Sequence, residues 1–313
     1  MSDEIDRHTL PVAAPVVMPK GMAIRYDMPD PRLAALITGY TAYSVESREP
    51  QVDWFLPAPV MLGVALDAGP IFPRIGSRPF PPMVQASLIG PTSRALSVTT
   101  HGGTMVGIGI SAAGWAALTG RSAVDFHNRI VPADTVLDPA VVGRLITVLT
   151  GAPDRAALKP LLDEVFLPLF TREDPHEAHI RTLMRLVVRP GLSEVGELAE
   201  EMGITASTLR RLSQRYFGMP SKLLMRRARF LRSFLQLFIS GNPTDPSAID
   251  PSYHDMPHFL RDANTFLGTT PRRFMQLANP FLEASVRARA AVLGAPTQAL
   301  HVAPTDIDID QHR

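Results

Sequence analysis

The sequence contains no cysteine. This absence excludes disulfide bonds, catalysis by a thiolate and zinc sites with cysteine ligands. There is also no run of about 18 apolar residues, so no membrane-spanning helix is predicted. The first ten residues, MSDEIDRHTL, carry acidic groups and no apolar segment, which does not fit a secretory signal peptide. We therefore expect a cytoplasmic protein without membrane association.

Motifs for catalysis and for cofactor binding are scarce as well. Gly107 and Gly109 lack the third glycine of a dinucleotide-binding loop, and residues 111–114 do not form a nucleophile elbow. His176 and His179 have a spacing found in helical zinc sites, but no third ligand follows at a useful distance. The sequence predicts neither an enzyme nor a bound metal or cofactor.

The 313 residues are 45% hydrophobic and 19% charged, which is typical of a folded protein with room for two domains. The net charge of +1 hides an uneven distribution. Residues 1–180 hold 14 basic and 18 acidic residues, whereas residues 181–290 hold 16 basic and 9 acidic residues. Every base in the second block except Lys222 is arginine. This block is therefore expected to bind a polyanion.

Short strand-like runs separated by turn residues dominate the first part of the chain. The predicted strands cover residues 40–45, 60–66, 84–89, 96–100 and 104–110. Gly102-Gly103 is typical of a hairpin turn between the last two strands, and the Pro/Gly-rich stretch 68–82 is expected to be a connector. Short helices are predicted over 31–37 and 112–118. Residues 22–135 thus predict an α+β fold with a mostly antiparallel sheet.

Residues 139–170 change to a helical pattern, broken near Gly151 and Pro153. We expect this helical pair to lie between two domains and to provide a dimer face. The predicted organisation is a flexible arm (1–21), an effector or dimerisation domain (22–170), a linker (171–180), a helical domain (181–290) and a flexible tail (291–313). Four residues of the predicted effector or dimerisation domain either line an effector pocket or belong to the core: Trp54, Phe55, His101 and Trp115.

Residues 195–220 predict two helices joined by a tight turn. Gly203 suits the turn and Thr205 is a candidate N-cap for the second helix. That helix turns Leu209, Leu212 and Tyr216 inward at helical spacing. Its outward residues are Ser207, Thr208, Arg210, Arg211, Gln214 and Arg215. The pattern is typical of a DNA-binding helix-turn-helix, and the alternative is an ordinary helical hairpin with a solvated, charged face.

A long helix is expected over 221–239, followed by a second helix-turn-helix over 252–275. Asp255 is a candidate N-cap, and Phe259, Ala263 and Phe266 share one helical face. Both units end alike, with an apolar residue and a glycine (Phe217-Gly218 and Leu267-Gly268) shortly before a proline. This repeated ending is harder to explain by chance than either unit alone.

These motifs resemble the C-terminal DNA-binding domain of the AraC/XylS family of transcriptional regulators, over about a third of the chain. The first unit has the family's pattern of capping residue, arginine-bearing helix and aromatic-Gly ending, and residues 226–229 (RRAR) are similar to its linker helix. The more diagnostic run in the second unit is formed by Tyr253, Asp255, His258, Phe259 and Arg261. One departure is that prolines interrupt residues 243–251, where the family has a helix, so a shortened supporting helix is expected.

The resemblance implies two recognition helices in successive major grooves of double-stranded DNA, about 34 Å apart. Arg210 and Arg211 are expected to read guanines, with Ser207 as a third base contact, while Gln214 and Arg215 hold phosphates. In the second unit His258 and Arg261 are the candidates. The predicted function is a transcription regulator, dimeric, controlled by a small-molecule effector and, if an activator, in contact with RNA polymerase. The alternative is a protein-interaction module whose second unit has lost specific DNA reading.

Overall fold

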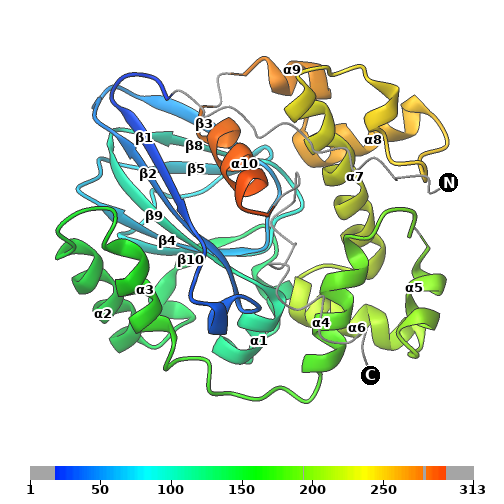
Figure 1. Ribbon diagram of the computed structural model, residues 1–313, viewed down its shortest axis with the longest axis horizontal. Coiled ribbons are helices and arrows are strands. Elements are labelled where there is room, and N and C mark those ends of the chain that lie inside the picture. Colours follow the sequence, from blue (N-terminus) through cyan, green and yellow to red (C-terminus); the bar gives the residue numbers. More distant parts are fainter. Residues whose placement is uncertain (1–17, 193, 278–279, 294–313) are drawn as a thin grey trace, which may run out of the picture.

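The computed structural model describes residues 18–192, 194–277 and 280–293. The first half of the chain folds into two antiparallel sheets flanked by helices, and the second half is helical and lies along one side of the sheets (Figure 1). The predicted fold class is therefore confirmed. No helix within the described residues is long and apolar enough to cross a membrane.

The larger sheet has six strands in the order β1-β2-β9-β4-β7-β10, and the smaller has four in the order β3-β8-β5-β6. Neighbouring strands in both sheets are antiparallel. The strands of the larger sheet are β1 (Met22–Asp27), β2 (Ile37–Val45), β4 (Val60–Leu66), β7 (Ala86–Ile89), β9 (Gly103–Ile110) and β10 (Ile130–Pro132). Those of the smaller sheet are β3 (Gln51–Phe55), β5 (Phe72–Ile75), β6 (Arg78–Pro79) and β8 (Leu96–Thr100).

Side chains alternate between the two faces of the larger sheet, and each face contributes to a hydrophobic cluster. Tyr40, Leu62 and Ile108 belong to the main hydrophobic core, which the sheet forms with helices on its outer side. Met61 and Met105, on the inner face, pack against the apolar residues of the smaller sheet. The space between the two sheets is therefore lined mainly by apolar side chains.

Several sequence predictions about these strands need correction. Gly102 and Gly103 have positive φ angles (74° and 96°), as a tight turn requires, but they do not form a hairpin. β8 pairs with β3 and β5, whereas β9 pairs with β2 and β4, so the chain crosses between sheets here. The stretch 68–82 contains β5 and β6, and β1, β3 and β10 were not anticipated. Most of the predicted arm, residues 1–17, lies outside the described residues.

Short helices surround the larger sheet: η1 (Pro31–Leu33), α1 (Ala112–Thr119), η2 (Ala123–Phe126), η3 (Ala133–Thr135), α2 (Pro139–Thr150) and α3 (Leu158–Phe166). The expectation for 31–37 is only partly met, since a 3₁₀ turn there gives way to β2. α2 and α3 share the main core with the larger sheet and lie on the other side of the molecule from the later helices (Figure 1). The expectation that this pair lies between two domains is therefore wrong.

The helical half contains α4 (Glu177–Val187), α5 (Val195–Glu201), α6 (Ala206–Phe217), α7 (Ser221–Ser240), η4 (Pro246–Ala248), α8 (Met256–Leu267), α9 (Pro271–Met275) and α10 (Pro280–Leu293). Thr205 caps α6 by accepting from the Thr208 N–H, and Asp255 caps α8 by accepting from the His258 N–H. Gly218 and Gly268 end these two helices in the left-handed conformation, each with φ near 75°. The two-unit pattern follows from these local signals.

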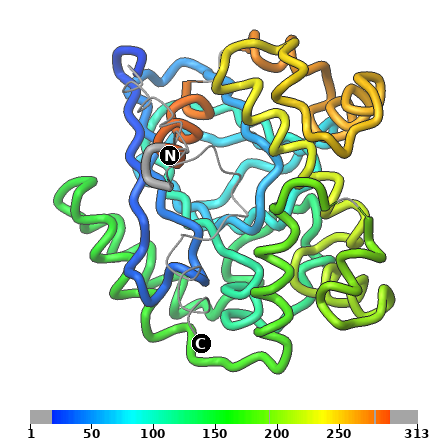
Figure 2. Tube along the Cα trace, turned by 45° about the vertical axis from the view of Figure 1, so that its right-hand side comes forward, coloured from blue at the N-terminus to red at the C-terminus, as the bar shows by residue number. Residues whose placement is uncertain are grey.

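α10 packs against β1 and β3 of the sheets (Figure 2). Its Phe281 ring meets the ring of Tyr43 edge-on, with centroids 5.1 Å apart. Its Leu282 and Val286 join the apolar cluster of α7 and α8. The last helix thus bridges the sheets and the helical half. Residues 291–293 continue it where a tail was expected, and residues 294–313 lie outside the described part.

Candidate functional site

The outward face of α6 is the first candidate surface. Leu209, Leu212 and Tyr216 are buried beneath it, which fixes the rotation of the helix. The opposite face exposes Ser207, Arg210, Arg211 and Arg215, with Thr208 and Gln214 half-buried beside them. The six residues selected from the sequence therefore share one surface. Among the described residues the three arginines form no ion pair, which leaves their charges available to an anionic partner.

The polar contacts of this face are weak and local. Arg211 lies with Nη2 3.4 Å from the Thr208 hydroxyl. Arg215 Nε donates to the Tyr216 hydroxyl (3.1 Å), which in turn donates to Asp174 (2.9 Å). Arg215 is therefore held at the edge of the helix, while Arg210 and Arg211 project from its centre.

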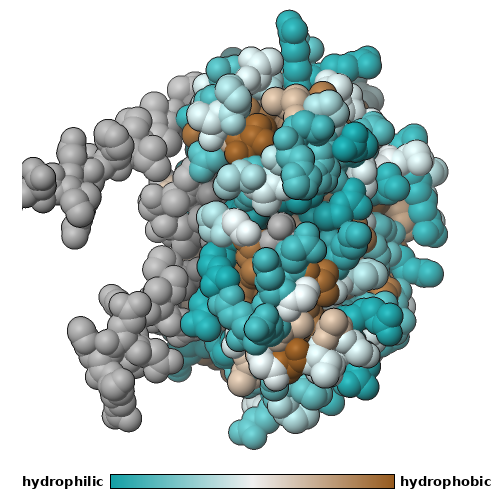
Figure 3. Space-filling model, turned by 90° about the vertical axis from the view of Figure 1, so that its right-hand side faces the viewer, coloured by the Kyte–Doolittle hydropathy of each residue, from teal (hydrophilic) through white to brown (hydrophobic). Residues whose placement is uncertain are grey.

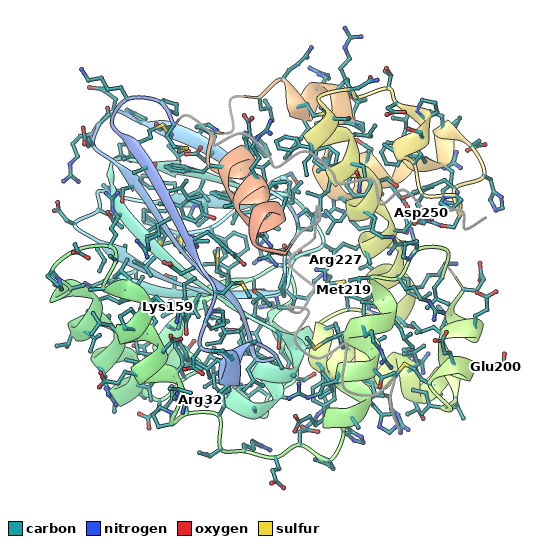
Figure 4. All side chains as sticks on the ribbon, in the orientation of Figure 1. Arg32, Lys159, Glu200, Met219, Arg227 and Asp250 are labelled. Atoms are coloured by element: carbon teal, nitrogen blue, oxygen red, sulfur yellow. The ribbon has the colours of Figure 1, made fainter. Side chains whose placement is uncertain are left out.

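α5, which precedes the turn, has the opposite charge. Its exposed acids are Glu194, Glu197, Glu200 and Glu201, the first of them at its N-cap. Glu200 projects outward at the edge of the molecule (Figure 4), and Glu201 pairs with Arg189. Carboxylates repel phosphate, so any polyanion on this part of the molecule is directed toward α6 and away from α5.

The second candidate helix, α8, has a less polar outer face. Arg261 is exposed, but so are Met256 (40%) and Leu260 (39%). His258 Nε2 lies 3.2 Å from Arg229 Nη2, which can only donate, so this nitrogen accepts and the ring is neutral. Burial and the charge of Arg229 lower the pKa of His258. His258 is thus engaged within the protein, and Arg261 is the exposed base of this helix.

The arginines of α7 are engaged with the second unit. Asp262 is buried and accepts from Arg226 (2.5 Å) and Arg229 (3.1 Å). Tyr253 donates to the same carboxylate over 2.9 Å. Arg232 of α7 forms a further ion pair with Asp250, which lies just after η4. The Nη2 and Oδ2 atoms of this pair are 2.7 Å apart. A single 3₁₀ turn, η4, replaces the supporting helix, and these ion pairs fix α8 on α7 in its place.

Arg227 is the exception among the α7 arginines. It is 1% exposed, points toward the sheets (Figure 4) and has no carboxylate partner in the part of the chain that the structure describes. Its Nη1 donates to the backbone carbonyls of Thr92 (2.6 Å) and Ala58 (3.3 Å). A backbone hydrogen bond from Ala95 to Phe266 (2.7 Å) adds a second link between the sheets and the helices. The two halves are therefore joined by directional polar contacts as well as apolar ones.

Three exposed bases were missed from the sequence: Lys222, Arg272 and Arg273. Lys222 follows Pro220 at the start of α7, and the two arginines follow Pro271 at the start of α9. The sequence does contain a signal for these bases. Both units end in a glycine and a proline, and a basic residue follows that proline in each unit. The surface of this side of the molecule is mostly hydrophilic, with small apolar patches (Figure 3).

A cavity between the two sheets is the second candidate site. It has two adjoining compartments of about 80 and 160 Å³. Phe55 lines both, as do Tyr43, Met61, Ile89 and Leu96. α10 closes the cavity, with Phe281 over the smaller compartment and Leu282, Val286 and Arg289 over the larger.

The other three predicted pocket residues lie elsewhere. Trp54 is on the opposite face of β3 from Phe55, and its ring meets Phe274 of α9 at 6.0 Å. His101 is a half-exposed turn residue whose Nδ1 lies 2.9 Å from the Pro70 carbonyl. Trp115 is fully buried in the main core, where its indole N–H donates to the Arg121 carbonyl (2.7 Å). Of the four predicted pocket residues, Phe55 alone lines the cavity.

The described residues contain no group of three or more His, Asp or Glu side chains able to hold a metal ion. The rings of His176 and His179 lie 6.3 Å apart, and the first also meets the ring of Tyr216. These histidines therefore pack against each other and, through His176, against the C-terminal turn of α6.

No protein-family model and no curated protein matches the sequence. Solved structures of ToxT from Vibrio cholerae are similar to this structure. One shares 10% of its residues with a TM-score of 0.42, covering 75% of this chain and 97% of that chain. Another, with a bound unsaturated fatty acid, shares 9% with a TM-score of 0.40, covering 83% and 96%. The AraC-like transcriptional activator CuxR shares 10% with a TM-score of 0.22, covering 68% and 86%. These are regulators of the AraC family, which the sequence resembles, and the matches span most of the chain.

Proposed function

We propose that this protein is a cytoplasmic, sequence-specific transcription regulator that binds double-stranded DNA through α6 and, more weakly, through α8. The observation that carries the proposal is the outward face of α6. It places Arg210 and Arg211 on an exposed helix face, without ion pairs among the described residues, over a buried apolar base. A helix with such a face fits the major groove, where arginine binds O6 and N7 of guanine with two hydrogen bonds.

The residues around these arginines have separate roles in the proposal. Ser207, one turn earlier, contacts a third base, while Thr208, Gln214 and Arg215 bind phosphates and set the register. Lys222, Arg272 and Arg273 supply further phosphate contacts. Arg261 contributes on α8, where His258 is engaged with Arg229. The second unit is therefore expected to add affinity more than specificity.

We further propose control by a small molecule, which the cavity between the sheets supports. α10 closes that cavity and also packs on the cluster that holds α7 and α8. A ligand beneath α10 thus changes the contacts that position the second unit. We further propose that the protein acts as a homodimer and, when it activates transcription, contacts RNA polymerase.

The test is a selection of bound sequences from a random pool of DNA duplexes. We expect a defined motif for the wild type and loss of preference at guanine positions for Arg210→Ala/Arg211→Ala. The matched control is Arg74→Ala/Arg78→Ala, which removes two exposed arginines of β5 and β6, outside the helical half and outside α2 and α3, and leaves the motif unchanged. Loss of a phosphate contact, as in Arg215→Ala, lowers the slope of log K against log salt by about 0.9 without changing the motif.

One observation favours the alternative of a protein-interaction module. Met256 and Leu260 are exposed on α8, where a DNA-reading helix usually carries polar residues. Under this alternative the selection yields no enriched motif even at low salt and with cavity ligands present. Met256→Ser/Leu260→Ser would then abolish binding of a protein partner while leaving DNA affinity unchanged.

A further inference from the structure

Within the described residues, the cavity between the sheets holds unpaired polar groups of opposite charge in its two compartments. The rest of its lining is mainly apolar. Buried polar groups are almost always hydrogen-bonded, so an unpaired one in a cavity points to a missing partner. The inference below rests on the proposed role of this cavity as the effector site.

The smaller compartment contains the carboxylate of Asp53. Alternation along β3 turns Gln51, Asp53 and Phe55 toward the other sheet. Asp53 is 2% exposed; its Oδ2 accepts from Gln51 Nε2 (3.1 Å), while Oδ1 has no partner among the described residues. The hydroxyl of Thr100, in the same wall, is also unpaired. Burial raises the pKa of Asp53 to about 6, which reflects the apolar surroundings. This end therefore needs a hydrogen-bond donor.

The larger compartment contains the guanidinium of Arg289 from α10. Its Nε and Nη2 are buried and unpaired within the described part of the chain. The guanidinium lies 5.5 Å from the ring centroid of Tyr26, and Leu231, Leu235 and Val286 line the space around it. A cation with two free N–H groups needs an anionic acceptor, and a carboxylate matches its geometry.

α10 sets the distance between the two ends. Phe281 lies over the smaller compartment and Arg289 over the larger, eight residues further along the helix. At 1.5 Å per residue, this spacing is about 12 Å. Met61 lines both compartments, and its flexible thioether is able to adapt to a chain that passes between them.

We propose that the cavity binds an elongated amphiphile with a carboxylate at Arg289, a hydroxyl at Asp53 and an apolar chain between them. Such a molecule satisfies the unpaired groups of both compartments at once. A simple fatty acid satisfies Arg289 but leaves Asp53 unpaired. A diol donates to Asp53 but offers Arg289 only a neutral acceptor in place of an anion. A site built to bond a hydroxyl rejects the analogue that lacks it, because its own polar group is then left without a partner.

The test compares three probes of equal chain length: 10-hydroxydecanoic acid, decanoic acid and 1,10-decanediol. Affinities are measured by calorimetry on the full-length protein. We expect the hydroxy acid to bind the wild type at least tenfold more tightly than either other probe. Asp53→Val should remove the preference over decanoic acid while leaving decanoic acid bound. Arg289→Gln should remove the preference over the diol.

Arg287→Gln is the matched control, because Arg287 lies on the same helix, pairs with Glu283 and does not line this cavity. It should keep the wild-type preference. Equal affinity for the hydroxy acid and decanoic acid overturns the proposal, as does absence of binding by all three probes. Either result leaves a DNA motif found in the selection intact. Conversely, tight binding of the hydroxy acid without any DNA motif rejects the regulator function and keeps the ligand site.

Discussion

The guanidinium of Arg227, in the middle of α7, donates to the backbone carbonyl of Thr92 over 2.6 Å and so joins the helical half to the loop before β8. The side chain is fully buried, and burial lowers its pKa to about 10. Its Nε has no partner among the described residues. A buried cation held by backbone carbonyls therefore couples the position of α7 to the sheets.

Replacing Arg227 by methionine keeps much of its apolar stem and removes its donors. The Ala58 carbonyl keeps a hydrogen bond from the Thr92 N–H, whereas the Thr92 carbonyl loses its donor. We expect the free energy of unfolding to fall by about 1–3 kcal/mol, the cost of an unsatisfied buried group. Urea unfolding measures this, with exposed Lys222→Met as control. Equal stability of both variants would show that relief of the buried charge offsets the lost bond.

Asp262 is expected to be the most sensitive residue of the second unit. Asp262→Asn keeps an acceptor for the Tyr253 hydroxyl but removes the negative charge between Arg226 and Arg229. Loss of one partner from a buried ion pair costs about 3–5 kcal/mol. The control is Glu283→Gln, which breaks the exposed pair with Arg287 on α10 and is expected to cost under about 1 kcal/mol. Similar midpoints of urea unfolding for the two variants contradict this assignment.

Gly218 and Gly268 provide a matched pair, because they end α6 and α8 with φ near 75°. A Cβ on Gly268 meets nothing within 4 Å, whereas one on Gly218 would lie 2.3 Å from Cγ of Pro91. We expect Gly268→Ala to cost about 1–2 kcal/mol, the price of a left-handed alanine. Gly218→Ala should cost about 1–3 kcal/mol more, because of overpacking. Thermal unfolding compares them, and equal losses would mean that α6 does not press on the sheets in solution.

Local signals in the sequence sufficed to locate α6 and α8. Thr205 acts through its hydroxyl, which accepts from the next turn, and Gly218 and Gly268 act through their own backbone conformation. Cap and turn chemistry therefore located α6 and α8. Pairing between strands is not local, and the prediction failed there. Gly102 and Gly103 have the expected backbone conformation, yet only the pairing of β8 and β9 with distant strands shows that the turn crosses between sheets.

The cavity illustrates the same limit. Trp54 and Phe55 are adjacent in the sequence, but alternation along a strand forbids both from facing one cavity. That β3 is a strand was hidden by Asp53, a residue type depleted in strands. The role of Arg289 in the cavity could not be predicted for another reason. The sequence of residues 280–293 does not indicate that α10 packs against the sheets. Its place depends on packing against β1 and β3, which is a property of the whole fold.

Asp53 should make stability depend on pH. Its pKa is about 6 in the folded protein against an ordinary value of 3.8, so the folded state holds the proton more tightly. The stabilisation is complete below pH 3.8 and is lost as pH rises through 6. Relative to Asp53→Asn, the free energy of unfolding should fall by about 2 kcal/mol between pH 4.5 and 7.5. Urea unfolding of the wild type and of Asp53→Asn is measured at both pH values. The difference between the two proteins cancels the titration of all other groups. A difference that stays constant would mean that Asp53 is solvated or already has a partner, and would remove the need for a donor at this end of the cavity.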